Sequence, residues 1–201
     1  INDQFGFTMA LDGDLAFIGA PLDDDNGFES GSAYIYKRIA GLWTADKKIT
    51  AHDGESGDQF GWSVALSAGN ALIGARFDDD KAFNSGSAYL YTRTSQTWHM
   101  KQKLTASDAA VNDQFGWTVA LDDKTAVIGA RFNDEMGINA GSAYVYTLND
   151  KVWRQQQKLT ASDGESGNQY SWAIALDGDK LVIGAPFDNY DDALSGSCYV
   201  Y

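Results

Sequence analysis

Asp58-Gln59-Phe60-Gly61-Trp62 is the stretch that decides the fold, because the chain repeats it at a fixed interval. The same motif begins at Asp3, at Asp113 and, in the altered form Asn-Gln-Tyr-Ser, at Asn168, so the interval is 55 residues throughout. A second motif keeps the same register, and its copies are Ile18-Gly19-Ala20, Ile73-Gly74-Ala75, Ile128-Gly129-Ala130 and Ile183-Gly184-Ala185. A fixed period without slippage means that each repeat is one structural unit, stacked or arranged around an axis.

Each of the first three repeats contains four segments with the patterns of short β-strands, the fourth repeat contains three, and no segment has a helical period. In the second repeat these segments are residues 62–66, 70–75, 87–91 and 97–105. Tight polar turns such as Asp12-Gly13 favour a hairpin between the first and second strands. The fourth strand alternates, which predicts Trp98, Met100, Gln102 and Leu104 on one face and His99, Lys101 and Lys103 on the other. The lysines would then protect this outer edge against pairing with another chain.

The two motifs together resemble the FG-GAP repeat of the integrin alpha-chain β-propeller and its bacterial relatives. This resemblance covers the whole chain and implies an all-β propeller built from four-stranded antiparallel blades. We therefore predict one propeller region over residues 1–201, with repeats at 3–57, 58–112, 113–167 and 168–201. The fourth repeat should lack its outer strand. We expect the chain to be a piece of something longer, with the ring completed by the parent chain or by a neighbouring copy.

Composition excludes some partners. The formal net charge of −13 repels phosphate backbones, so we expect no nucleic-acid binding. No apolar run approaches the roughly 18 residues that a membrane helix needs, so we expect no membrane insertion. His52 and His99 do not recur in the repeats, and no nucleophile–histidine or H-E-x-x-H motif is present. We therefore expect no catalytic site and no organic cofactor.

Aromatic residues recur at fixed repeat positions. The six tryptophans are Trp43, Trp62, Trp98, Trp117, Trp153 and Trp172. We predict that most of them are buried between blades, and an aromatic platform for sugar rings is the alternative if some of the rings are exposed. Cys198 stands where the other copies have alanine, which predicts a small buried side chain.

Acidic loops follow the second strand of each repeat, at residues 23–26, 78–80, 133–135 and 188–192. Aspartate oxygens are the ligands that Ca²⁺ prefers, so these loops could hold an ion, and solvated turn-forming aspartates are the alternative. The candidate metal residues are Asp23, Asp25, Asp78, Asp80, Asp134 and Asp188. The calcium run of the family, D-x-D-x-D-G, lies in the first hairpin. That hairpin here is only Leu11-Asp12-Gly13-Asp14, so the family's own calcium residues do not carry over.

Arg76 and Arg131 interrupt the repeat beside the acidic loops, where the other copies have Pro21 and Pro186. Antiparallel strand order puts the acidic loops and the blade-joining loops at the same end, so one face should collect most of the acid. A local ion pair is one interpretation of the arginines, and a docking point for a ligand carboxylate is the other. We name as candidate ligand-binding residues Arg76, Arg131, Asp78 and Asp134.

These features favour a non-catalytic binding or adhesion module at the cell surface or outside the cell, with a protein or carbohydrate ligand and with Ca²⁺ as a candidate aid. One alternative is an assembly protein whose neighbouring copies complete the propeller by self-association. Another is the non-catalytic propeller region of a secreted hydrolase. Fold similarity alone does not choose among these functions.

Overall fold

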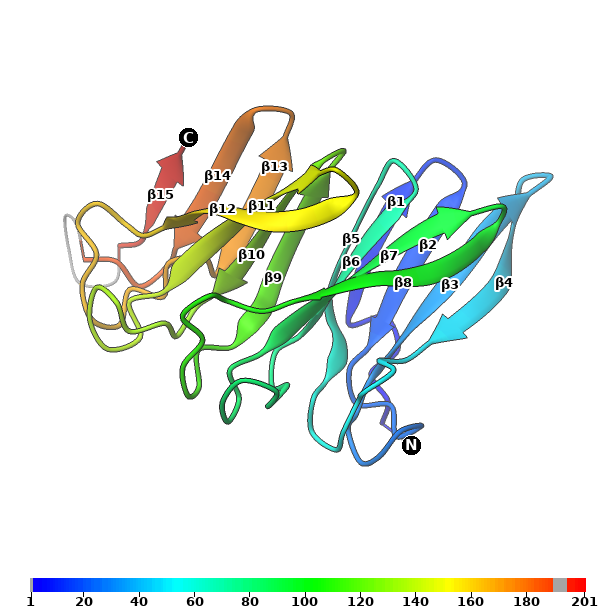
Figure 1. Ribbon diagram of the computed structural model, residues 1–201, viewed down its shortest axis with the longest axis horizontal. Helices are drawn as coiled ribbons and strands as arrows, with labels where there is room; N and C mark the ends of the chain where they lie inside the picture. The colour runs from blue at the N-terminus through cyan, green and yellow to red at the C-terminus, as the bar shows by residue number, and fades with distance from the viewer. Residues whose placement is uncertain (1, 190–194) are drawn as a thin grey trace.

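The computed structural model describes residues 2–189 and 195–201, and every regular element among these residues is a β-strand. The strands form four antiparallel sheets that stand side by side in chain order as an open arc, with the chain ends at opposite ends of it (Figure 1). We call these sheets blades one to four. The fold-class prediction is confirmed, including a fourth blade of three strands.

Each blade is a meander in which consecutive strands pair. Blade one holds β1 (Thr8–Asp12), β2 (Leu15–Ala20), β3 (Ser32–Ile39) and β4 (Leu42–Ile49). Blade two holds β5 (Phe60–Ser67), β6 (Asn70–Ala75), β7 (Ser87–Thr94) and β8 (Thr97–Leu104). Blade three holds β9 (Phe115–Asp122), β10 (Thr125–Ala130), β11 (Ser142–Asn149) and β12 (Val152–Leu159). Blade four holds β13 (Ala173–Asp177), β14 (Lys180–Ala185) and β15 (Ser197–Val200).

The hydrophobic core consists of layers between successive blades. Phe17 and Ile35 of blade one pack in one cluster with Phe60, Tyr89 and Trp98 of blade two. Equivalent clusters lie between blades two and three and between blades three and four. Each layer removes apolar surface from water on two sheets at once, which is the main force that holds neighbouring blades together.

The glycines of both motifs meet where successive blades touch. A Cβ atom on Gly74 would lie 2.1 Å from the carbonyl oxygen of Gly116 in the next blade. Gly116 has a φ of +90°, and a Cβ there would lie 2.4 Å from the carbonyl oxygen of Ser87. Only glycine fits such an approach without moving a backbone. The two repeated motifs are therefore the two sides of one contact between blades.

A β-bulge interrupts the outer strand of each complete blade. In blade two, Leu90 pairs with Gln102 and Tyr91 pairs with Met100, so Lys101 has no opposite residue in the ladder. An extra residue in one strand reverses the side-chain alternation beyond it.

This bulge makes the predicted faces of the outer strand wrong. Trp98 and Met100 pack in the layer toward blade one, whereas Leu104 packs in the layer toward blade three. Lys103 therefore lies on the same side as Trp98. It points into the loops at the end of the blade and does not guard the edge of the sheet.

The tryptophans divide into three environments. Trp98 and Trp153 are buried between blades as predicted, with 3% of each exposed. Trp43 is 44% exposed, because it lies on the open side of blade one. Trp62 in β5 and Trp117 in β9 are half-buried, and Trp172, just before β13, is 38% exposed. The prediction of burial between blades is therefore wrong for these three and for Trp43.

The two outermost blades each present an open face among the described residues. An apolar cavity of about 420 Å³ lies on the open face of blade one. Its lining includes Phe5, Met9, Leu11, Ile18, Tyr36 and Trp43. On blade four, Val200 is 73% exposed, and Cys198 is exposed although its equivalents Ala33, Ala88 and Ala143 are buried. The prediction that Cys198 is buried is therefore wrong, because no further blade packs on it.

Candidate functional site

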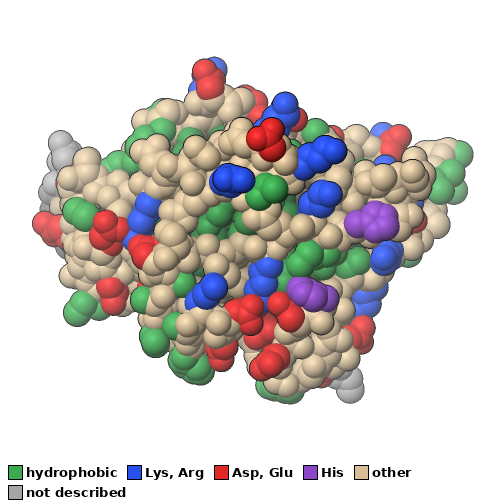
Figure 2. Space-filling view, in the orientation of Figure 1, with side chains coloured by type: hydrophobic (Ala, Val, Ile, Leu, Met, Phe, Trp, Pro, Cys, Tyr) green, Lys and Arg blue, Asp and Glu red, His purple; other side chains and the backbone are tan. Residues whose placement is uncertain are grey.

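The acidic loops and the blade-joining loops meet at one end of the blades, as the strand order predicts. The Tyr89 hydroxyl lies 2.9 Å from Asp53 Oδ1 in a joining loop and 2.7 Å from Asp78 Oδ2 in an acidic loop. In Figure 2 acidic and basic side chains lie next to each other along the lower part of the molecule. Part of the acid at this end therefore lies beside positive charge.

That positive charge comes from one lysine of each outer strand, held in what we call a lysine cage. Lys103 Nζ lies 2.9 Å from Asp53 Oδ2 and 2.8 Å from Asp78 Oδ2, and it also forms an ion pair with Asp80. Its ammonium group stands 5.0 Å from the centre of the Tyr89 ring. The cages of blades one and three are Lys48 with Asp23 and Asp25, and Lys158 with Asp108, Asn133 and Glu135.

The lysines control the protonation of the carboxylates around them. Burial alone would raise the pKa of Asp53, but hydrogen bonds from Lys103 and Tyr89 outweigh it and hold that pKa below its ordinary value. The pKa of Asp23 and that of Asp108 are lowered by the same balance, with Lys48 and Lys158 as the donors. Asp23, Asp53 and Asp108 therefore stay ionised at neutral pH.

The predicted metal residues of blades one to three do not fit a calcium ion. Asp23 and Asp25 come together, as do Asp78 and Asp80, but around a lysine ammonium group that would repel a metal ion. Asp134 is exposed and accepts the backbone N–H of Asn139 at 2.7 Å, outside the cage. Asp188 lies in blade four with Asp163 near the same tyrosine hydroxyl.

Within residues 2–189 and 195–201, no group of three or more Asp, Glu, His or Cys side chains has the arrangement of a metal site. Part of the predicted fourth loop, residues 190–192, lies outside the described residues. Calcium binding itself remains a prediction.

A row of aromatic rings, which we call the ladder, crosses from the inner strand of one blade to that of the next. Ring centres are 4.5 Å apart between Phe7 and Trp62, 4.9 Å between Trp62 and Trp117, and 5.3 Å between Trp117 and Trp172. Each rung comes from the residue that follows the repeated FG motif. The fixed period of the chain therefore builds the ladder directly.

Arg76 and Arg131 stack on this ladder. The guanidinium carbon of Arg76 lies 3.2 Å from the centre of the Trp62 ring, and that of Arg131 lies 3.4 Å from the centre of the Trp117 ring. The same two carbons are 5.1 Å from Trp117 and 4.8 Å from Trp172. Both arginines therefore approach the single ring of Trp117, which places their charges near each other.

No carboxylate of the described chain forms an ion pair with either arginine, so the described residues do not support the local ion-pair interpretation. The acidic candidates Asp78 and Asp134 are held by other groups and do not join the arginines. Burial, followed by the charge of Arg131, lowers the pKa of Arg76 to about 9, and burial lowers the pKa of Arg131 to about 10. Both charges are thus partly removed from water without a counter-charge.

Glutamines of the repeated motif orient the arginines. Gln59 Oε1 accepts a hydrogen bond from Arg76 Nε at 2.9 Å, and Gln114 Oε1 accepts one from Arg131 Nε at 3.4 Å. Gln59 and Gln114 have φ values of 57° and 56°, in the left-handed region that favours glycine. The equivalent residues Gln4 and Gln169 have φ values of 54° and 51°, so this conformation belongs to the repeat and is not special to the arginines.

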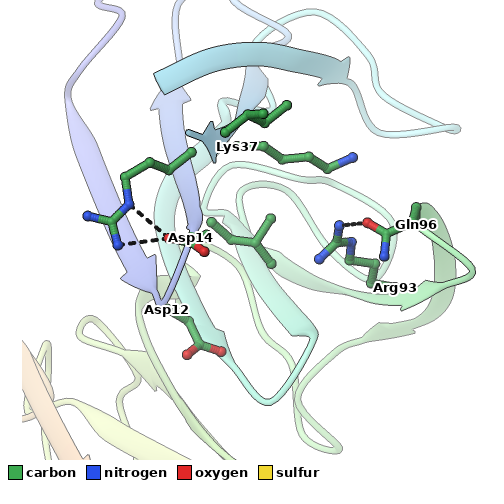
Figure 3. A pocket seen from close by; sticks show the side chains of 8 residues that line it. Asp12, Asp14, Lys37, Arg93 and Gln96 are labelled. Atoms are coloured by element: carbon green, nitrogen blue, oxygen red, sulfur yellow. Dashed lines mark hydrogen bonds and ion pairs between the residues drawn. The ribbon is translucent and has the colours of Figure 1, made fainter. Parts of the chain in front are cut away.

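A polar cavity lies on blades one and two, at the end opposite the acidic loops (Figure 3). Its volume is about 600 Å³, and its lining includes Asp12, Asp14, Lys37, Arg38, Arg93 and Gln96. Arg38 Nη2 forms an ion pair with Asp14 Oδ1 at 2.8 Å, and Arg93 donates to Gln96, so these groups already hold one another. The cavity is a weaker candidate than the arginines of the ladder.

Asp58 provides a stability test of this face. It is 5% exposed, and burial followed by the charge of Asp78 raises its pKa to about 6. In blade three, Asp113 and Asn133 occupy the positions of Asp58 and Asp78, and Asn133 Nδ2 donates to Asp113 Oδ2 at 3.0 Å. Blade two has two carboxylates instead, one of which is costly to ionise.

We expect Asp58→Asn to raise the free energy of unfolding at pH 7 by up to about 3 kcal/mol, since the pKa of Asp58 is raised from 3.8 to about 6 and one pKa unit corresponds to about 1.4 kcal/mol. The folded pKa of Asp58 exceeds its unfolded value of 3.8, so the gain should be full above pH 6 and should vanish below pH 3.8. Denaturant unfolding at several pH values measures it. A loss of stability at pH 7 would contradict the assignment.

The cage lysines Lys48, Lys103 and Lys158 were not predicted from the sequence to lie among the acidic loops. Each lies 25 positions after the buried acidic-loop residue that it binds, Asp23, Asp78 or Asn133. A lysine at a constant distance from an acidic loop in three repeats is a signal that could have revealed the cages.

A comparison with protein families found a match to the model described as FG-GAP repeat, at residues 1–36, 43–91, 98–146 and 153–201. No curated protein showed significant similarity to the chain. None of the described residues forms a helix long and apolar enough to cross a bilayer.

Proposed function

The chain belongs to the FG-GAP repeat family, and from that membership we propose that it is a non-catalytic binding module whose ligand docks a carboxylate on Arg76 and Arg131. One observation carries the proposal: two partly buried arginines approach the same Trp117 ring and have no carboxylate partner in the described chain. An arginine fork matches a carboxylate with two parallel hydrogen bonds. A ligand carboxylate would supply the missing counter-charge. An adhesive role at the cell surface or outside the cell is the setting we propose.

The ladder prepares the arginines for such a ligand. Stacking on Trp62 and Trp117 fixes the planes of the two guanidinium groups before a ligand arrives. Groups that are already ordered lose less conformational entropy on binding. The net charge of −13 disfavours polyanions at long range, so the site should favour a ligand with an isolated acidic group, on a protein or on a carbohydrate.

We expect Arg131→Gln to weaken binding of a carboxylate ligand at least about tenfold, because a hydrogen-bonded charge is typically worth about 1.5–3 kcal/mol. Two probes separate the ligand classes: a glycine–serine peptide with one glutamate, and a glucuronate disaccharide. Tryptophan fluorescence follows the titration, since Trp117 lies under the arginine.

The exposed residue Arg154 on β12 provides the matched control, Arg154→Gln. It should leave both the affinity and the melting temperature unchanged. Arg131→Gln removes no ion pair of the fold, but it does remove the stacking on Trp117 and the hydrogen bond to Gln114, so the affinities are compared well below the melting temperature of each variant. Equal affinity for Arg131→Gln and the control would contradict the proposal.

Assembly is the second candidate function, and the open faces favour it. Met9, Leu11 and Trp43 on blade one are 66%, 67% and 44% exposed, and Val200 on blade four is 73% exposed. These two faces are the equivalents of surfaces that pack together inside the arc. Sedimentation of the purified chain tests this function: a stable dimer would support assembly, and a monomer that binds the carboxylate probes would support the binding module.

A further inference from the structure

The polar cavity of Figure 3 contains an arginine whose counterpart in the neighbouring blade has a carboxylate partner. In blade one, Arg38 Nε and Nη2 both lie 2.8 Å from Asp14 Oδ1. Arg93 is the equivalent of Arg38 in blade two, and the equivalent of Asp14 there is Gly69. The backbone contact is the same, since the N–H of each arginine donates at 2.9 Å to the carbonyl oxygen of Asp14 or Gly69. Blade two therefore has the arginine of this pair without its acid.

Blade three shows that the turn itself does not require an arginine at this position. Leu148 and Lys124 occupy the two equivalent positions, and the Leu148 N–H donates to the Lys124 carbonyl oxygen at 2.9 Å. Of the three complete blades, only blade two combines the arginine with a residue that offers it no carboxylate. The charge of Arg93 is thus not explained by the fold of the hairpin.

Hydrogen bonds within the described chain satisfy Arg93 only in part. Its Nη2 donates to Gln96, whereas its Nε is buried and has no hydrogen-bond partner among the described residues. No described carboxylate forms an ion pair with it. A buried donor without an acceptor is rare in folded proteins. In Arg38 the same edge of the guanidinium group, Nε with Nη2, meets the Asp14 carboxylate.

The cavity has room for a small molecule beside this edge. Its volume of about 600 Å³ lies within the usual range of small-ligand pockets. Figure 3 shows Lys37 and Arg93 directed toward the same side of the cavity. Lys37 is paired with Asp46 at 2.7 Å and Arg38 with Asp14, so Arg93 is the cation of this cavity that has no carboxylate. Leu15 and Ile39 add apolar surface to the lining.

We infer that this cavity binds a small organic monocarboxylate, whose carboxylate accepts hydrogen bonds from Arg93 Nε and Nη2 in place of Gln96. The same molecule supplies the reference geometry in the contact of Asp14 with Arg38. The apolar part of the ligand would lie against Leu15 and Ile39. The inference does not rest on the proposed function, because Arg76 and Arg131 follow the opposite ends of their strands, β6 and β10.

The charges around the cavity favour a single negative charge over a phosphate dianion. The cations are Lys37, Arg38 and Arg93, and the anions are Asp12, Asp14 and the Asp46 partner of Lys37. These charges balance, so a dianion would bring an excess of negative charge close to Asp12 and Asp14. The net charge of −13 on the whole chain acts in the same direction.

An NMR titration of the purified chain with isovalerate tests the inference, and isovaleramide is the neutral probe of nearly the same shape. We expect isovalerate to shift the Nε–H resonance of Arg93 with saturation, and isovaleramide to leave it unmoved. In variants, the backbone amides of residues 93–97 report binding. Arg93→Gln should weaken binding of isovalerate at least about tenfold, as expected for loss of a charged hydrogen-bond donor.

Lys124→Gln is the matched control, because Lys124 is exposed and lies in the equivalent hairpin of blade three. It should bind isovalerate as the wild type does, and so should Arg131→Gln, which alters only the ladder. Inorganic phosphate should bind more weakly than isovalerate.

Four results would overturn the inference. The first is the absence of a saturable shift at Arg93, and the second is equal affinity of Arg93→Gln and Lys124→Gln for isovalerate. Equal shifts with isovalerate and isovaleramide would show that the cavity does not select a carboxylate, and tighter binding of phosphate would assign it to a different anion. Loss of the Arg93 shift in Arg131→Gln would place the bound carboxylate on the ladder.

Discussion

Replacing Lys103 by glutamine is expected to lower the free energy of unfolding by about 3 kcal/mol, the low end of the range for breaking a buried ion pair. Asp78, 3% exposed in its side chain, would keep its charge without the ammonium group 2.8 Å away. Asp53 and Asp80 are 30% and 51% exposed, so water would compensate them in part. Thermal and denaturant unfolding measure the loss.

Lys101→Gln is the matched control, because Lys101 lies two residues earlier, is exposed and sits in the bulge. It should change stability by less than about 0.5 kcal/mol, as is usual for a surface position. Asp78→Asn in the Lys103→Gln background should recover part of the loss, since Asn133 occupies that position in blade three. Equal stability of the Lys103→Gln and Lys101→Gln proteins would refute the cage.

The pH dependence of this difference has a defined sign. The folded pKa of Asp53 lies below its unfolded value of 3.8, so its contribution is present above pH 3.8 and is lost as the pH falls through the folded value. The folded pKa of Lys103 lies above its unfolded value of 10.5, so its contribution is present below pH 10.5 and is lost as the pH rises further. The gap between wild type and Lys103→Gln should therefore be widest near neutral pH.

Gly74→Ala is the second change with a large expected effect. The added Cβ would lie 2.1 Å from the carbonyl oxygen of Gly116 and 2.3 Å from Ser63 Oγ, so the backbone of blade three would have to move. We expect a loss of about 3 kcal/mol or more, at or above the usual upper end for overpacking. Urea unfolding of the purified chain measures it.

Gly184→Ala is the matched control for this test, because Gly184 occupies the same motif position in blade four. A Cβ there would meet its nearest atom, the carbonyl oxygen of Ala173, at 3.9 Å, which is an ordinary contact. The isolated chain should therefore tolerate Gly184→Ala. Similar losses for the two variants would contradict the role of the motif as a contact between blades.

The 55-residue period made the architecture predictable. The FG and Ile-Gly-Ala motifs recur without slippage, and the structure places them in contact across every pair of blades. The hairpin turns, the doubly buried second strands and the three-stranded fourth blade also followed from local pattern. Repeats reveal a fold in this way because every unit must make the same contacts with its neighbour.

The candidate site was less predictable, for two physical reasons. The bulge at Lys101 exchanges the two faces of β8 for the residues that follow it, and no residue type in the strand predicts a bulge there. A pattern with period two therefore placed Lys103 at the sheet edge, when it lies among Asp53, Asp78 and Asp80. The partial exposure of Trp117 was missed because burial depends on the curvature of the arc, which sequence periodicity does not encode.

Arg76 and Arg131 could be identified from the sequence because each breaks the repeat. Their stacking partners, Trp62 and Trp117, could not be. Ion pairing was the simpler expectation beside acidic loops, but the carboxylates of those loops form their ion pairs with the cage lysines. The arginines lie instead on tryptophan rings that the same repeat supplies. Whether a lysine or an arginine pairs with these carboxylates depends on which cation the fold brings closest. That cannot be predicted from any single segment of the sequence.

The most direct measurement of the carboxylate site is an NMR titration that follows the Nε–H resonances of Arg76 and Arg131. Addition of the glutamate peptide or of the glucuronate disaccharide is predicted to shift both resonances together, with one dissociation constant, and to leave that of Arg154 unchanged. The indole N–H of Trp117 should shift with the same constant, because both arginines approach its ring. Shifts confined to the cage lysines or to Arg154, with Arg76 and Arg131 unmoved by either probe, would contradict the proposed function.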